Sequence, residues 1–155
     1  MVEEPAAFFV YGTLKRGQSN YPLIEEAVRG MVPATIRGRL YDVGPFPALA
    51  EGDEAVRGEV LVVDPVELPR LLSVLDELEG YLPSDPAGSM YVRRAVVAAA
   101  DDGGEVAAYA YFYNRDPVGL RHLPGGDWRG PSTDAVVEVS EELTGFGRHV
   151  REFRR

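Results

Sequence analysis

Three carboxylates crowd the end of one predicted amphipathic helix, and one of them has the placement of an acid–base group. They are Asp76, Glu77 and Glu79. The apolar stripe of this helix centres near Leu71; at 100° per residue Glu79 lies roughly 70° from that centre, and Asp76 and Glu77 roughly 130° away. Partial burial, the neighbouring negative charges and the negative end of the helix dipole would all raise the pKa of Glu79. We therefore expect Glu79 to be a candidate general acid or base. A solvated acidic helix end is the plainer alternative.

A glycine-containing loop follows the first apolar run of the chain. In residues 11–15 (YGTLK) a strand ends, a glycine turns the chain, and a helix is predicted shortly afterwards. Consecutive backbone N–H groups in such a turn can converge on an anion. On pattern alone, a tight turn with the solvated cations Lys15 and Arg16 is favoured. The spacing matches neither a P-loop nor a dinucleotide fingerprint, so nucleotide binding is not indicated.

Three tyrosines alternate along a later predicted strand. Tyr109, Tyr111 and Tyr113 are two residues apart, which puts their hydroxyls on one face of the strand. An aromatic stripe is more often core than pocket. Tyrosine at all three positions nevertheless indicates that some hydroxyls find polar partners or a wet cavity. In the preceding strand Arg93 and Arg94 fall on opposite faces, so one of them is expected to point inward, most simply as an ion-pair partner.

The pattern predicts mostly strands to hold these residues. Strands are expected over residues 6–11, 35–43, 56–63, 91–100 and 105–113, with a short one near 135–139. Residues 101–104 (DDGG) indicate a hairpin turn. The prolines in residues 44–49 should keep that segment out of a ladder, and Gly58 is expected to mark a bulge or a close approach.

Two helices are predicted beside these strands. One is a short helix over Tyr21–Arg29 with Asn20 as its N-cap, and the other covers Pro69–Glu79 and is ended by Gly80. Several strands are apolar on both faces, and a doubly wound sheet needs more crossover helices than two. We therefore predict the α+β class, as a small closed or nearly closed β-barrel with one or two flanking helices. Residues 1–155 are expected to form a single domain, with a motif-free tail after about residue 128 that is basic over 148–155.

Composition excludes several classes of function. The 155 residues hold 16 Lys and Arg against 25 Asp and Glu, a net charge of -9 that argues against nucleic acid and anionic membranes as partners. The chain has no cysteine, which excludes disulfides and thiolate nucleophiles, and its two histidines lie far apart, so no metal site is expected. No apolar run reaches ~18 residues and the N-terminus is acidic, so we expect neither a membrane span nor a signal peptide, and a cytoplasmic location. The oligomeric state cannot be inferred from these features.

Five blocks of residues resemble, in the same order, the γ-glutamylcyclotransferase-like (AIG2-like) family. They are residues 9–15 (FVYGTLK) with Gly17 and Asn20, 38–41 (GRLY) with 46–48 (FPA), 56–60 (VRGEV), 75–81 (LDELEGY) followed by 91–93 (YVR), and 108–111 (AYAY). The resemblance spans about Phe8 to Tyr113. It implies a mixed β-barrel with flanking helices and an enzyme that releases 5-oxoproline without a cofactor. In that reaction the α-amine of a γ-glutamyl group attacks its own γ-carbonyl and expels an amine.

The resemblance also implies roles for individual residues. Glu79 stands at the position of the catalytic glutamate, where it would take a proton from the α-ammonium and give one to the leaving amine. The N–H groups of Gly12, Thr13 and Leu14 would hold the substrate carboxylate or the developing oxyanion.

Two tyrosines, Tyr11 and Tyr111, would shape the cavity and orient a small γ-glutamyl substrate. The leaving amine would be selected by loops such as residues 45–53 and 82–89. The alternative function is a non-catalytic carboxylate-binding module on the same fold. A pure carboxylate binder gains nothing from an acidic group facing its pocket, so Glu79 favours the enzyme.

Overall fold

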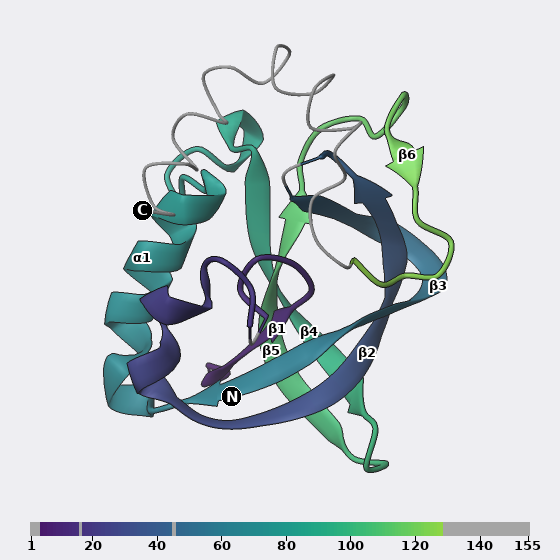
Figure 1. Ribbon diagram of the computed structural model, residues 1–155. Helices are drawn as coiled ribbons and strands as arrows, with labels where there is room; N and C mark the ends of the chain where they lie inside the picture. The colour runs from purple at the N-terminus through teal and green to yellow at the C-terminus, as the bar shows by residue number, and fades with distance from the viewer. Residues whose placement is uncertain (1–3, 16, 45, 129–155) are drawn as a thin grey trace.

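A closed ring of strands with one α-helix against it forms the architecture of the computed structural model (Figure 1). The structure describes residues 4–15, 17–44 and 46–128, and the predicted strand near 135–139 and the basic tail lie outside them. Within these residues the elements are β1 (Ala7–Val10), β2 (Val28–Asp42), β3 (Pro47–Val63), α1 (Leu68–Glu79), β4 (Tyr91–Ala100), β5 (Glu105–Tyr113) and β6 (Arg121–His122). The predicted β-barrel is therefore confirmed, with α1 as its flanking α-helix.

Strand pairing closes the barrel. The order is β3-β1-β5-β4-β2, and a further pairing of β2 with β3 completes the ring, while the short β6 adds to β2. Strand β1 runs parallel to β5, with Phe8 opposite Tyr109, and antiparallel to β3. The remaining neighbours pair antiparallel. The barrel is thus mixed. Among the described strands its one parallel pairing, which we call the parallel seam, joins β1 to β5.

Apolar side chains of the strands form two cores. One core fills the barrel interior and takes buried side chains from all five strands of the ring, among them Phe9, Val56 and Phe112. The other lies between the outer wall and α1, where Leu71 and Leu75 are fully buried. The side chains of β1 alternate between these two cores, so that both of its faces are buried, as its uninterrupted apolar sequence predicts.

The predicted hairpin and the main helix are confirmed. Strands β4 and β5 have the predicted bounds, and Gly103 in their turn takes a positive φ of 99°. Helix α1 begins one residue before the predicted start and ends at Gly80, whose φ of 67° is left-handed. Gly58 of β3 is a point of close approach, because a Cβ there would lie 2.3 Å from the carbonyl oxygen of Val10.

The helix predicted over Tyr21–Arg29 is wrong. The segment forms two 3-10 turns, Tyr21–Leu23 and Glu25–Ala27, and β2 begins at Val28. Asn20 stands at the N-cap position of the first turn, but its side chain makes no capping hydrogen bond, and its Nδ2 donates instead to Thr13 Oγ1 at 2.8 Å. Pairing of the start of β2 with the end of β3 therefore overrides the local helical pattern.

The prediction that residues 44–49 stay out of a ladder is also wrong in part. Strand β3 begins at Pro47, which pairs with Asp42, and Ala48 and Leu49 continue the ladder. A proline is tolerated at the first position of a strand because no N–H is needed there. Among the described residues, no helix is long and apolar enough to cross a membrane.

Candidate active site

A cavity lies where β1 runs into the loop that follows it. Its wall includes all six residues that the sequence singled out for binding or catalysis: Tyr11, Gly12, Thr13, Leu14, Glu79 and Tyr111. They come from the β1 end and its loop, from the last residue of α1 and from β5. Phe46 and Tyr91 add aromatic surface, and Asn20 adds a polar side chain. The fold thus brings together groups that are far apart in the chain.

The loop is held by its carbonyl groups and by Asn20. The N–H of Lys15 donates to Gly12 O at 3.0 Å, and the N–H of Asn20 donates to Thr13 O at 2.7 Å. Within the described part of the chain, the N–H groups of residues 12–14 have no hydrogen-bond acceptor. Residues 12–14 line the cavity.

Lys15 is not the solvated cation that the pattern favoured. Its Nζ donates to Trp128 O at 2.7 Å and lies 3.5 Å from a carboxylate oxygen of Asp127. The Trp128 side chain is buried with the barrel interior. Lys15 therefore links the loop to Asp127 and Trp128, next to this core.

Gly12 is required for space and not for an unusual backbone angle. Its φ is not positive. A Cβ at this position would lie 2.7 Å from both Cδ and Cγ of Pro47, at the start of β3. Pro47 also lines the cavity, so the wall of the site is packed tightly against the loop that forms it.

Replacing Gly12 by alanine is expected to displace the loop or Pro47. We expect turnover to fall at least tenfold and the free energy of unfolding to fall by about 1–3 kcal/mol, the usual cost of overpacking. Urea denaturation and steady-state kinetics measure the two effects. Gly30→Ala is the matched control, because a Cβ at Gly30 meets nothing within 4 Å. If Gly12→Ala behaves like Gly30→Ala, the close packing against Pro47 does not matter.

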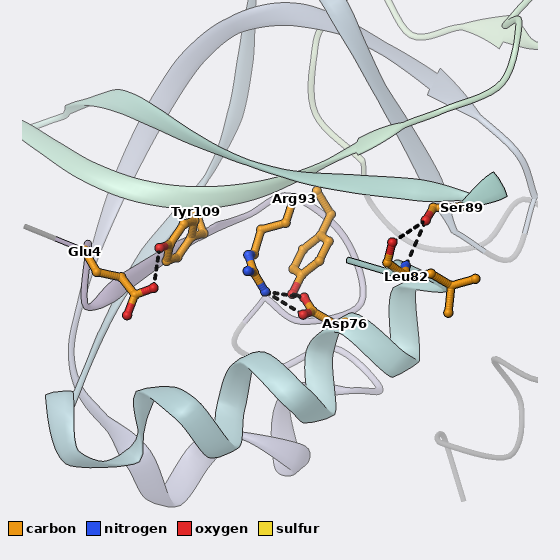
Figure 2. Close-up of polar contacts among 7 residues, drawn as sticks. Glu4, Asp76, Leu82, Ser89, Arg93 and Tyr109 are labelled. Atoms are coloured by element: carbon orange, nitrogen blue, oxygen red, sulfur yellow. Dashed lines mark hydrogen bonds and ion pairs between the residues drawn. The ribbon is translucent and has the colours of Figure 1, made fainter. Parts of the chain in front are cut away.

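Asp76 is buried, contrary to its predicted place on the exposed flank of the helix. Figure 2 shows its carboxylate beside the guanidinium of Arg93, which comes from β4. Arg93 Nη1 donates to both carboxylate oxygens, at 2.7 and 2.5 Å, and Tyr111 O–H donates to Oδ1 at 2.5 Å. Because of these partners, the buried face of α1 includes Asp76 as well as its leucines. Arg93 is thus the inward-pointing arginine of the pair, and Arg94 bonds to the exposed Glu51 instead.

Aromatic rings flank the same guanidinium. The Cζ atom of Arg93 lies 5.4 Å from the ring centre of Tyr81 and 5.1 Å from that of Tyr109. Such contacts add cation–π attraction to the ion pair. Asp76, which lies within one turn of Glu79, therefore connects the end of α1 to β4 and β5.

Two of the three tyrosines that line the cavity, Tyr11 and Tyr111, have raised pKa values. Burial, followed by the negative charge of Glu79, raises the pKa of Tyr11 well above its usual value. Burial also raises the pKa of Tyr111, together with its hydrogen bond to Asp76. Tyr11 O–H donates to Tyr111 O at 2.5 Å. Neither phenol is therefore suited to lose a proton near neutral pH.

Sequence reasoning identifies three residues of the site region only in part. Asn20 and Pro47 belong to the family motifs, but Asn20 is predicted as a helix cap and Pro47 as part of a segment outside the ladder, and Asp76 is predicted to lie away from the apolar stripe. A signal for a buried carboxylate is present in the sequence, because one of Arg93 and Arg94 is expected to point inward as an ion-pair partner. The contact of Pro47 with Gly12 could not be predicted from a local pattern, because it depends on how β3 meets the loop.

Comparison with known proteins gives a consistent result. Residues 8–130 match the family described as "Gamma-glutamyl cyclotransferase, AIG2-like". The γ-L-glutamyl-butirosin B γ-glutamyl cyclotransferase of Niallia circulans is 34% identical over 109 residues, which cover 70% of this chain and 67% of that protein. The γ-glutamylaminecyclotransferase of Bos taurus is 32% identical over 133 residues, covering 77% and 72%. A crystal structure of an AIG2-like protein from Mus musculus superposes with a TM-score of 0.56 at 27% identity, covering 84% of this chain and 99% of that one.

Proposed function

The chain belongs to the AIG2-like γ-glutamyl cyclotransferase family, and from this premise we propose that it releases 5-oxoproline and a free amine from a γ-glutamyl amine or peptide. The observation that supports the proposal is the single cavity that holds Glu79, the loop of residues 12–14 and Tyr111. Glu79 and the residues that carry the N–H groups of this loop line the same cavity. We infer that Glu79 exchanges the proton and that the N–H groups hold the anion, the two tasks that an intramolecular cyclisation needs.

The reaction proceeds within the substrate. The N–H groups of residues 12–14 hold its α-carboxylate, and Glu79 takes a proton from the α-ammonium. The free amine then attacks the γ-carbonyl carbon, forming the C–N bond of a five-membered lactam while the bond to the leaving amine breaks. Glu79 returns its proton to that amine, and the second proton that the attacking nitrogen must lose on becoming the lactam N–H follows the same route. The amine therefore leaves as an ammonium ion and the enzyme ends unchanged. Folding the substrate back on itself replaces a bimolecular encounter, which accounts for much of the rate gain.

The names of the relatives support a preference among the candidate substrates. Their names assign them to γ-glutamyl-butirosin B and to γ-glutamylamines. In both, the γ-glutamyl group is attached to a nitrogen that must leave as an amine. We therefore place γ-glutamyl amides of primary amines first among the candidate substrates of this chain, ahead of γ-glutamyl dipeptides.

A substrate panel tests the proposal. The protein is incubated with γ-glutamylamines, γ-glutamyl dipeptides and ε-(γ-glutamyl)lysine, and 5-oxoproline is detected by mass spectrometry. We expect release from at least one γ-linked compound and none from its α-glutamyl isomer, in which attack on the γ-carboxylate expels no amine. Binding without release would favour the carboxylate-binding module, and absence of both would remove the assignment.

A further inference from the structure

Asn20 has a buried side-chain amide in the cavity wall, and the oxygen of this amide accepts no hydrogen bond from the described residues. Its side chain is 1% exposed, and it lines the cavity. Its Nδ2 donates to Thr13 Oγ1 at 2.8 Å, and its backbone N–H donates to Thr13 O at 2.7 Å. Its Oδ1 is buried and has no hydrogen-bond partner within the described residues.

An unpaired buried acceptor is unfavourable. Most buried polar side-chain atoms in proteins are hydrogen-bonded, and those that are not require an explanation. The brace to Thr13 fixes the amide from one side, so Oδ1 cannot turn away to reach water without breaking that bond. A group that binds in the cavity and carries a hydrogen is the natural partner.

We propose that Asn20 Oδ1 accepts a hydrogen bond from the substrate's α-nitrogen, the atom that becomes the lactam N–H of 5-oxoproline. This inference rests on the proposed function. The α-carboxylate and the γ-carbonyl of a γ-glutamyl group offer only acceptors, and these suit the N–H groups of residues 12–14. Within the γ-glutamyl group itself the α-nitrogen is the one donor, and 5-oxoproline retains it, whereas the N–H of the scissile amide leaves with the amine. The α-nitrogen is therefore the group that the acceptor oxygen selects.

The contact would also orient the nitrogen. A hydrogen bond to Oδ1 fixes one N–H of the amine, and its lone pair is then left to face the γ-carbonyl carbon. Asn20 thereby combines two tasks, since the same side chain braces the anion-holding loop through Thr13. These tasks are carried by opposite ends of one amide and can be separated by substitution.

The test compares two ligands that differ at one atom. The first is 5-oxoproline, and the second is 5-oxotetrahydrofuran-2-carboxylate, in which a ring oxygen replaces the lactam N–H. We expect the wild-type protein to bind the lactam roughly tenfold to a hundredfold more tightly, because the lactone leaves Oδ1 unpaired. Isothermal titration calorimetry on the full chain gives both affinities.

Three variants assign the preference to Oδ1. Asn20→Leu removes both ends of the amide and should abolish the preference for the lactam. Asn20→Asp keeps an acceptor oxygen, which Thr13 O–H can also reach, and should retain the preference even if both ligands bind more weakly. Thr13→Val removes only the brace and should weaken both ligands alike. Thermal unfolding of each variant confirms that the compared proteins are folded.

The outcomes are distinguishable. A wild-type protein that binds both ligands equally, or an Asn20→Leu variant that keeps the lactam preference, overturns the role of Oδ1 while leaving the cyclotransferase assignment intact. Loss of the preference in Asn20→Asp overturns it as well, because the cavity would then require the amide NH₂. If the wild-type protein binds neither ligand and releases no 5-oxoproline, the proposed function fails together with the inference.

Discussion

Replacing Glu79 by glutamine is expected to lower turnover by on the order of 10²–10⁴, the usual contribution of a general acid–base group. Glutamine keeps the size of the side chain and its hydrogen-bonding capacity, but it does not exchange protons in the required range. The variant should still bind 5-oxoproline with an affinity close to that of the wild-type protein, because the N–H groups of residues 12–14 are unchanged. Single-turnover release of 5-oxoproline and calorimetric binding measure the two quantities.

Glu77→Gln is the control for this experiment. Glu77 belongs to the same turn of α1 but is exposed and does not line the cavity. Its replacement removes the same charge from the end of the helix and should change turnover far less. If Glu77→Gln abolished turnover while Glu79→Gln retained it, the assignment of the acid–base group would be wrong.

Asp76→Asn is expected to lower the free energy of unfolding by about 2–3 kcal/mol. Breaking a buried ion pair leaves the remaining charge without compensation, which costs about 3–5 kcal/mol when the pair is fully buried. Here the side chains of Arg93 and Asp76 are still 18% and 13% exposed, so we expect a smaller cost than for a fully buried pair. Turnover should also fall, because Tyr111 loses the carboxylate that holds its hydroxyl in the cavity wall.

A surface ion pair supplies the comparison for Asp76. Arg70 and Glu67 are bonded at 2.6 Å, but their side chains are 52% and 39% exposed. Exposed pairs contribute little, so Glu67→Gln should change the free energy of unfolding by less than about 0.5 kcal/mol. Urea denaturation of the two variants under identical conditions makes the comparison. Equal effects would show that the buried network does not stabilise the fold.

Local patterns were sufficient where local chemistry decides the structure. The hairpin of β4 and β5 has its turn residues in the sequence, and α1 has an apolar stripe and a terminal glycine. The candidate site was also predictable from the sequence, because the ordered motifs marked Tyr11 to Leu14, Glu79 and Tyr111, and these residues line one cavity. Their roles remain predictions.

Long-range contacts decided the elements that sequence reasoning missed. Tyr21–Arg29 has a helical pattern, but Val28 pairs with Val63 of a distant strand. The position of Asp76 depends on Arg93 and Tyr111, which reach it from two strands. A helical wheel contains no information on what packs against the helix, so it placed this carboxylate in solvent. Proximity in space and not local propensity set each of these outcomes.

The parallel seam between β1 and β5 has a consequence for the kinetics of folding. Tyr11 and Tyr111, which bond across the site, are separated by 100 positions in the chain. Closing so long a loop costs conformational entropy before any contact compensates for it, and folds dominated by such contacts cross their barrier slowly, in the range of milliseconds to seconds. The cavity has walls from both ends of this loop, so it cannot exist in a partly closed barrel. The recovery of ligand binding during refolding should therefore coincide with the final closure of the ring and show no earlier phase.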